Sequence, residues 1–353
     1  MDKHSTRMLL QQVGVPAPKG RLFSQERFAE AASYAEEIGY PVVVKPLRGT
    51  HGRGVVTGIS DEKELAWAFD SLAKSAHARD DVILEEHIEG EAYRIIVLGD
   101  EVVSALISRR GAVTGDGEKT VRELIEERQQ QRLLNPHLMA RPIRRGSRLT
   151  HLLARQDVTL DSVLEPGRTV EITYGSNTSQ GGEHAQVLDR MHPSILEASV
   201  ESVKALPGLG FGGVDFIISD IEKPLDQQRA AICEINSMPS VDSHEYPLYG
   251  EPISVPRKMV EASAEAAGIS LREYNPHLSV HAEIDATDRN PRYRRWLRRQ
   301  AMDLGLDCRL RPIGSRRIKV DLQGGAEPVA AWLALSIHSP YGLDPKKVEV
   351  IHA

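Results

Sequence analysis

Hydrophobic positions in the first third of the chain fall into helical and extended patterns that follow one another. Apolar residues recur at helical spacing over 28–38, with Gly39 as the stop, and again over 65–72. Short β-branched runs at 42–45, 55–56 and 82–85 predict strands between and after these helices. Residues 94–98 and 102–107 predict a hairpin around Gly99-Asp100.

The middle of the chain is less periodic. Residues 120–128 predict a helix, and the stretch from there to about residue 169 is rich in Arg and Leu with little period. Two apolar runs, 213–218 and 231–236, then predict strands joined by a polar connector. The first 274 residues therefore predict an α+β domain with mixed helices and strands.

The last 75 or so residues predict a simpler order of helices and strands. Alternation over 278–285 predicts a strand, and Tyr293, Trp296, Leu297, Ala301 and Leu304 form one helical stripe. A strand pair around Gly314-Ser315, a helix over 328–337 and a last strand over 347–351 follow. The order βαββαβ is that of a small ferredoxin-like split βαβ domain.

Charge supports a domain boundary at the same place. The chain has 353 residues with 44 Lys and Arg against 50 Asp and Glu, a net charge of −6. Residues 278–353 hold 13 basic and 9 acidic side chains, whereas residues 1–277 hold 31 and 41. This change of sign predicts domains at 1–274 and 275–353. An acidic large domain also argues against nucleic acid as a partner, because affinity for nucleic acid depends on neutralising phosphates.

Composition excludes several other classes of protein. No apolar run approaches the roughly 20 residues that span a bilayer, so no membrane association is expected. The N-terminus is too polar for a secretory signal. Cys233 and Cys308 are too few for a disulfide framework or a thiolate metal cluster. We therefore expect a cytoplasmic protein.

A lysine at a strand end precedes a glycine-rich segment. Lys45 closes the run 42–45, and residues 48–54 hold three glycines and two arginines. Glycines let backbone amides approach phosphate oxygens, and a lysine supplies a point charge beside them. A solvated strand-end charge followed by an ordinary hairpin explains the same residues. The segment is neither a Walker loop nor a Rossmann fingerprint.

The two strands at 213–218 and 231–236 carry a second set of polar residues. Glu234 and Asn236 share a face because alternate strand residues point the same way. Antiparallel pairing would bring Asp215 onto that face, giving oxygen ligands suited to Mg²⁺. Solvated polar positions on a half-exposed strand are the alternative. Cys233 falls on the opposite face and is interpreted as a small buried hydrophobe rather than a nucleophile.

Residues 177–182, Asn-Thr-Ser-Gln-Gly-Gly, form a polar loop that suits either anion binding or a plain surface turn. His244, with Pro247 and Gly250 after it, is equally ambiguous, since a lone histidine is more often structural than catalytic.

Taken in order, these motifs resemble the ATP-grasp superfamily. The chain shows VVVKP, the glycine-rich loop, LEEHIEG, YRIIVLG, TGDGEKTVRELI, SNTSQGG, GVDFI and CEIN. Within the superfamily it is similar to the ATP-grasp modules of cyanophycin synthetases and bifunctional glutathione synthetases, over roughly residues 2–263. TGDGEKTVRELI and SNTSQGG are particular to that branch.

The resemblance implies an ATP-dependent carboxylate–amine ligase whose two α+β subdomains grip ATP. A substrate carboxylate would attack the γ-phosphate, and an amine would then displace phosphate from the acylphosphate. The implied substrates are small amino acids or peptides, and the implied cofactor is Mg²⁺, as two ions, with Mn²⁺ as an alternative.

The resemblance also assigns residues by motif position. The residues implied to bind nucleotide are Lys45, Gly49, His51, Gly52, Gly54, Glu85, Glu86, the Ile88 backbone and Glu91. The residues implied to bind metal are Asp215, Glu234 and Asn236. The residues implied to lie at the reacting phosphate or on the substrate side are Arg94, Arg110, Asn177, Ser179, Gly181, Gly182 and His244.

Two departures from the family pattern affect this interpretation. Ala92 stands where the family has a ribose-binding acid, which leaves Glu91 or Glu89 to substitute. The chain also begins at the Asp-Lys…Thr-Arg segment that normally follows a separate N-terminal domain. We therefore expect an acceptor site completed by a homodimer or a partner protein. An ATP-binding regulatory subunit without its own acceptor site is the alternative.

The C-terminal segment is more weakly similar to acylphosphatase. Arg294 matches that family's loop arginine, but the loop glycines are absent and Pro312 replaces the asparagine. A phosphate loop without glycines and with Asp288 should bind anions poorly. We therefore expect a catalytically inactive module for docking, substrate holding or dimerisation, with an acylphosphate-editing activity as the alternative.

Overall fold

The computed structural model describes residues 3–48, 54–176, 178, 181–271, 275–286, 291–338 and 344–352. Contacts divide the chain into two compact units. Unit 1 comprises Met1–Ser108, Ala185–His244 and Gly250–Lys258, and unit 2 comprises Arg109–His184, Glu245–Tyr249 and Met259–Ala353. Among the residues described, no helix combines the length and apolarity that crossing a bilayer requires.

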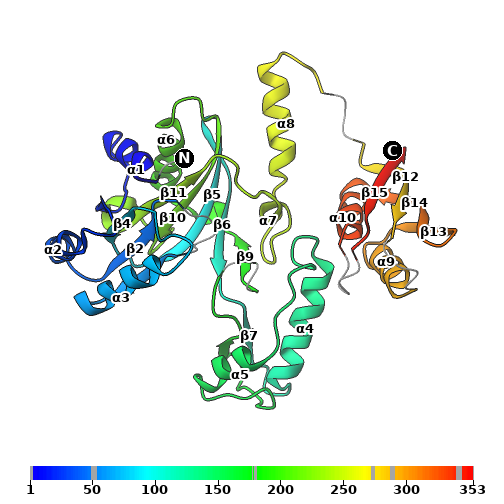
Figure 1. Ribbon diagram of the computed structural model, residues 1–353. Coiled ribbons are helices and arrows are strands. Elements are labelled where there is room, and N and C mark those ends of the chain that lie inside the picture. The colour runs from blue at the N-terminus through cyan, green and yellow to red at the C-terminus, as the bar shows by residue number, and fades with distance from the viewer. Residues whose placement is uncertain are drawn as a thin grey trace. The chain divides into compact units, whose positions relative to one another are not determined.

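Unit 1 contains a four-stranded antiparallel sheet with the order β1-β4-β2-β3. Helices α2 and α3 pack on it, and their small and apolar residues form one core with the strands (Figure 1). Asp61 caps α3 by accepting a hydrogen bond from the Glu64 amide. The strands and helices are β1 (Gly20–Phe23), α2 (Phe28–Ile38), β2 (Val42–Pro46), β3 (Val56–Ile59), α3 (Glu62–Ala73) and β4 (Val82–Glu86).

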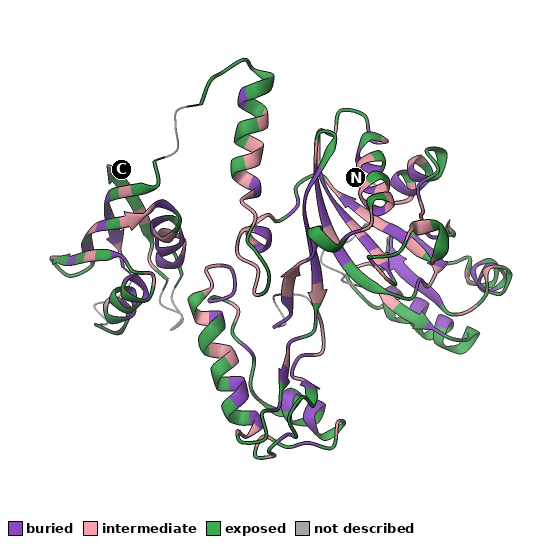
Figure 2. Ribbon diagram, turned by 180° about the vertical axis from the view of Figure 1, so that it is seen from behind, coloured by how far each residue is buried: buried purple, intermediate pink, exposed green. Residues whose placement is uncertain are grey.

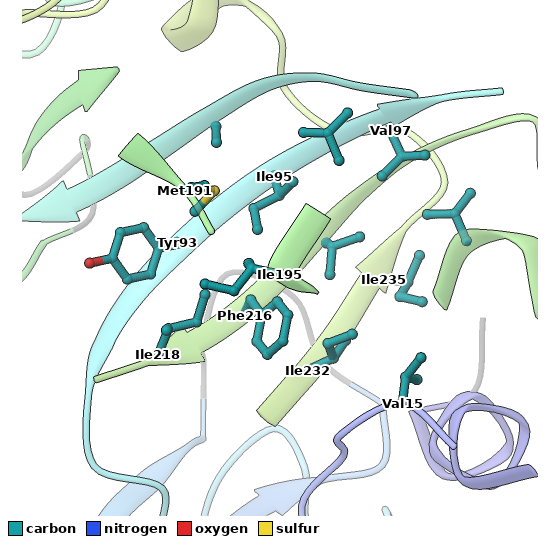
Figure 3. Packing of buried hydrophobic residues seen from close by; sticks show 14 of the residues in the cluster. Val15, Tyr93, Ile95, Val97, Met191, Ile195, Phe216, Ile218, Ile232 and Ile235 are labelled. Atoms are coloured by element: carbon teal, nitrogen blue, oxygen red, sulfur yellow. The ribbon is translucent and has the colours of Figure 1, made fainter. Parts of the chain in front are cut away.

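A five-stranded sheet in the order β11-β10-β5-β6-β9 forms the second layer. Helix α6 packs on β10 and β5, and α1 packs on β11. Isoleucines, valines and Phe216 from the strands meet Ile195 of α6 and Val15 in one buried cluster (Figure 3). The elements are α1 (Lys3–Gln12), β5 (Glu91–Leu98), β6 (Glu101–Arg109), β9 (Glu183–Gln186), α6 (Pro193–Lys204), β10 (Phe211–Ile218) and β11 (Ala230–Asn236).

Burial differs between the strands and the helices of unit 1. The strands are largely buried, whereas the helices turn exposed faces outward (Figure 2). The predicted hairpin around Gly99 is confirmed as β5 and β6, and the strands predicted at 213–218 and 231–236 are confirmed as β10 and β11, which pair antiparallel. The short helices η2 (Leu188–Arg190) and η3 (Leu225–Gln227) also lie in unit 1, whereas α7 (Asp242–Glu245) and α8 (Val255–Ala266) each contain residues of both units.

The first part of unit 2 joins a two-stranded ribbon, β7 (Ala112–Thr114) and β8 (Thr169–Glu171), to helices α4 (Val121–Leu134) and α5 (Ser147–Ala154). Thr120 and Glu123 form a reciprocal capping box at the start of α4. The helix predicted at 120–128 is longer than expected, because α4 continues to Leu134. Helix α5 lies in the stretch that showed little period, and with eight residues it has only about two turns over which a pattern could repeat.

The C-terminal part has the predicted βαββαβ order and an antiparallel sheet ordered β13-β14-β12-β15. Both helices pack on one face, with Trp332 and Leu297 fully buried. The predicted phosphate loop falls partly on residues 287–290, outside the described residues. The elements are β12 (His277–Asp285), α9 (Pro291–Asp303), β13 (Asp307–Ile313), β14 (Arg317–Gly325), α10 (Ala326–Ser336) and β15 (Lys347–His352).

Candidate active site

Unit 1 contains a polar cavity of about 580 Å³, within the range of ligand pockets. Its walls come from α1, from β2 and β4 of the first sheet, and from the edge strand β11 of the second. The lining residues are Lys3, Thr6, Arg7, Leu10, Pro18, Lys45, Leu47, Arg48, Ile83, Glu85, Ile232, Cys233, Glu234, Ile235, Asn236, Ser237 and Met238.

Lys45 and Glu85 form an ion pair in the wall of this cavity. They lie on neighbouring strands, where Lys45 is opposite Ile83 and Glu85 is opposite Val43, so both point to the same face. Both are buried, with 8% and 5% of their surface exposed. Burying a charge costs free energy unless the charge is paired, and here each side chain is the partner of the other.

The other described residues assigned to the nucleotide, Gly54, Glu86, Ile88 and Glu91, do not line the cavity. Glu86 accepts a hydrogen bond from the Lys19 amide at 2.9 Å and pairs with Arg229 at 2.7 Å. Ile88 is buried, and Glu91 is exposed at the start of β5. Gly54 is described, whereas Gly49, His51 and Gly52 lie outside the described residues.

Arg7 is a cavity residue that the sequence did not single out. It is 6% exposed on the face of α1 that also carries Thr6 and Leu10. Its Nη2 donates to His4 Nδ1 at 2.7 Å, and its buried Nε and Nη1 have no hydrogen-bond partner among the residues described. Burial lowers the pKa of Arg7, and the Glu85 carboxylate opposes that shift.

One signal in the sequence could have identified Arg7. It lies three positions before Leu10, so a helix would place both side chains on its buried face. A buried guanidinium with unused donors, in the wall of a cavity, suits an anionic ligand.

Asp215 and Glu234 face each other directly across β10 and β11. Arg94 is opposite Asp215 on the other side, in β5, and its Nη2 donates to Asp215 Oδ2 at 3.2 Å. Asn236 Nδ2 donates to the same oxygen at 3.1 Å. Burial raises the pKa of Asp215, Arg94 lowers it, and the neighbouring Glu234 raises it further.

These three side chains fit a hard divalent cation by their donor atoms. Two carboxylates placed at paired strand positions repel each other, and a cation between them relieves that repulsion. Glu234 and Asn236 line the cavity. The described residues contain no group of three or more His, Cys, Asp or Glu side chains spaced to hold a metal, so the amide oxygen of Asn236 is the third donor available.

Cys233 directly precedes Glu234 in β11. It lines the cavity and is partly exposed, whereas the sequence predicted a fully buried residue. Burial raises the pKa of its thiol to about 12, so the thiol is protonated at neutral pH. A role as nucleophile is therefore disfavoured, as predicted from the sequence.

Of the other residues assigned to the substrate side, three are described by the structure and two are not. Arg110 is half exposed and pairs with Glu171 at 2.8 Å. Gly181 and Gly182 accept hydrogen bonds from Arg132 through their carbonyl oxygens. Asn177 and Ser179 lie outside the described residues.

His244 lies inside unit 1. Its side chain has no exposed surface, and its Nδ1 lies 2.6 Å from the Ser104 hydroxyl, which also accepts from Gln186 at 2.8 Å. The substrate contact expected for His244 stays a prediction. Its burial in α7 depends on packing that no local pattern records.

Comparisons with known proteins agree with this geometry. Residues 2–107 match the family described as carbamoyl-phosphate synthase L chain, ATP binding domain. Cyanophycin synthetase of Synechocystis sp. is 31% identical over 258 residues, which cover 72% of this chain and 29% of that protein. The glutathione biosynthesis bifunctional protein of Clostridium perfringens is 27% identical over 265 residues, covering 74% of this chain and 33% of that protein.

A solved structure shares the fold. The crystal structure of a bifunctional glutathione synthetase from Pasteurella multocida is similar with a TM-score of 0.58 at 26% identity, over 75% of this chain and 36% of that one. This chain thus spans about a third or less of the length of these two curated relatives.

Proposed function

Because this chain contains an ATP-grasp domain homologous to those of cyanophycin synthetases and bifunctional glutathione synthetases, we propose that it is an ATP-dependent carboxylate–amine ligase. A carboxylate oxygen of the first substrate attacks the γ-phosphorus of ATP, giving an acylphosphate and ADP. The amine of the second substrate then attacks the acyl carbon. Its C–N bond forms as the C–O bond to phosphate breaks, and the amine loses a proton.

We assign the nucleotide phosphates to the basic side of the cavity. Lys45 and Arg7 carry buried positive charge in its wall, and Lys3 and Arg48 add two more cations. The loop at Gly49, His51, Gly52 and Gly54 would cover the phosphates. Glu85, Glu86 and the Ile88 backbone would hold the adenine, and Glu91 the ribose. Catalysis of phosphoryl transfer depends mainly on positioning and charge neutralisation, which a basic wall supports.

Asp215, Glu234 and Asn236 are the residues that would hold magnesium, as two ions, with manganese as an alternative. Bound there, the metal would neutralise charge on the phosphoryl group being transferred. Arg94 opposes the rise in the pKa of Asp215 that burial causes, and its two hydrogen bonds orient the Asp215 carboxylate. Arg94 and Arg110 would also neutralise the reacting phosphate.

The acid substrate is assigned to Asn177, Ser179, Gly181 and Gly182, and its class to amino acids or small peptides. A homodimer or a partner protein is also part of the proposal. The domain limits 1–274 and 275–353, and a non-catalytic role for the C-terminal domain, also remain predictions.

The observation that carries the proposal is the cavity itself, in which a buried cationic wall meets the oxygen donors of β11. The test is release of ADP from ATP in the presence of paired acids and amines, with mass spectrometry of the condensation products. We expect ADP, phosphate and one amide in equal amounts. ATP binding without ADP release across a broad panel would overturn the proposal and favour an ATP-binding regulatory subunit.

A further inference from the structure

Helix α4 carries three polar residues on one face of its C-terminal half. Arg128, Arg132 and the C-cap residue Asn135 are spaced by four and three positions, so they follow one another along that face. Each contacts a segment distant in sequence from the helix. This face of α4 is therefore an attachment surface for other parts of unit 2.

Arg132 has no exposed surface, and the hydrogen bonds that it makes to described residues all end on backbone carbonyls. Its Nη1 donates to Gly181 O at 3.3 Å and Gly182 O at 3.2 Å, and its Nη2 donates to Arg141 O at 2.8 Å. Because a guanidinium is a rigid planar fork, it can hold these three carbonyls in a fixed arrangement.

The carbonyl contacts determine where the loop amide points. A trans peptide is planar, with its C=O and N–H on opposite sides. When the Gly181 carbonyl is turned toward Arg132, the Gly182 N–H is therefore turned away from it. Gly181 adopts a φ of +94°, and a Cβ there would lie 2.7 Å from Thr173 Cγ2, so this backbone conformation requires glycine.

Charge beneath the loop is positive overall. Arg128 lies 3.5 Å from Glu183, and Glu183 opposes the lowering of the pKa of Arg132 that burial causes. Burial also raises the pKa of Glu183 itself. Two guanidinium groups thus face one carboxylate, which favours an anion on the side of the loop away from α4.

The second attachment fixes a neighbouring segment of the same unit. Asn135 Nδ2 donates to Tyr246 O at 2.9 Å and Pro247 O at 3.4 Å, and its Oδ1 accepts from the His137 and Leu138 amides. Tyr249 donates its hydroxyl hydrogen to Glu183 at 3.3 Å. The segments 181–183 and 245–249 are therefore joined to one helix face.

We propose that Arg132 is a positioning residue that holds the Gly181-Gly182 backbone in the conformation that binds the carboxylate of the acid substrate. This inference rests on the proposed function, in which that loop contacts the acid. Arg132 touches no substrate itself and acts through the two glycine carbonyls. The ATP cavity is lined by other residues, so nucleotide binding should not depend on Arg132.

The assay traps the acylphosphate with hydroxylamine, so the natural amine need not be known. The wild-type chain is incubated with ATP, Mg²⁺, hydroxylamine and the twenty standard amino acids. The nitrogen of hydroxylamine attacks the acyl carbon and displaces phosphate, and mass spectrometry identifies the acid from its hydroxamate. KM and kcat for that acid, and the Kd for ATP by calorimetry, are then measured for each variant.

We expect Arg132→Lys to lower kcat/KM for the acid about 10- to 100-fold, mostly through KM, because a compact ammonium on a flexible stem lacks the rigid planar spread of donors with which the guanidinium meets three carbonyls. The Kd for ATP should stay within twofold. Arg132→Ala should lose more and regain activity with millimolar guanidinium chloride, but not with equal sodium chloride. The matched control is Arg122→Lys, on the same helix, where the arginine is exposed and paired with Asp161 at 2.8 Å.

Two outcomes would overturn the inference while leaving the ligase proposal intact. One is an acid kcat/KM in Arg132→Lys within twofold of wild type. The other is a parallel loss of ATP affinity with no response to guanidinium in Arg132→Ala, which would indicate general destabilisation. If wild type forms no hydroxamate with any amino acid, the proposed function for this substrate class fails first, and the assigned role of Arg132 fails with it.

Discussion

Replacing Arg7 with methionine tests the buried cationic wall of the cavity most directly. The side chain is 6% exposed, and its Nε and Nη1 are buried without hydrogen-bond partners among the residues described. If these donors bind ATP phosphate, Arg7→Met removes at least one charge-assisted hydrogen bond. Such a bond contributes about 1.5–3 kcal/mol, so the Kd for ATP should rise roughly 10- to 150-fold.

The same change should affect the free protein in the opposite direction. Holding a guanidinium away from water with unused donors costs stability, and methionine of similar length removes that cost. Glu85 keeps its partner Lys45, so no new buried charge is left alone. We therefore expect the melting temperature of Arg7→Met, measured without nucleotide, to be equal to or above that of wild type.

Calorimetric titration with ATP and thermal unfolding without it separate these two effects. Arg190→Met is the matched control, because Arg190 is exposed, pairs with Glu222 at 2.6 Å and does not line the cavity. It should leave the Kd for ATP unchanged. An Arg7→Met variant that binds ATP within twofold of wild type would refute the assignment of this residue to the phosphates.

Three further predictions address the rest of the cavity. Glu234→Gln should abolish ADP formation and leave the circular dichroism spectrum unchanged, because it removes metal-binding charge from β11; turnover near the wild-type rate would contradict the metal assignment. Gly20→Ala should weaken ATP binding, because a Cβ at Gly20 would overlap Arg7 Nη1 and would also lie 2.7 Å from Glu85 Cβ and 2.8 Å from the Leu84 carbonyl oxygen; an unchanged Kd would contradict the assignment of this part of the wall to ATP. Cys233, studied in a Cys308→Ser background, should react with iodoacetamide about 1,000-fold more slowly at pH 7 than an ordinary thiol, since its pKa of about 12 exceeds the usual 9.0. Its rate should rise tenfold per pH unit through pH 10 and fall when ATP is added; a plateau near pH 9 would contradict the raised pKa.

Local sequence patterns predicted those parts of the candidate site that depend on the alternation of side chains along a strand. The spacing of Glu234 and Asn236 predicted a shared face, and the strand of Asp215 pairs antiparallel with theirs. The position of Lys45 at the end of an apolar strand likewise predicted a charge near a binding surface, and it lines the cavity. The shared face of Glu234 and Asn236 and the strand-end position of Lys45 depend on close neighbours in the chain, which the sequence displays directly.

Features that depend on distant contacts were not predictable in this way. Arg7 is buried because Gly20 of β1 and Glu85 of β4 lie next to it in the fold, although neither is close to it in the sequence. His244 is buried by its contact with Ser104, 140 positions away. Helix α5 is too short for a periodic pattern to be recognised, so its leucines did not predict a helix.

The position of β11 at the end of its sheet has a consequence for shortened forms of the protein. Its outer edge receives partial cover from the segment after α1, where Pro16 accepts a hydrogen bond from the Ile232 amide at 2.9 Å. A chain starting after residue 18 would uncover that edge, with Ile232 and Ile235 on it, and an open apolar edge pairs readily with other strands. Such a truncation should self-associate, as well as lose one wall of the cavity.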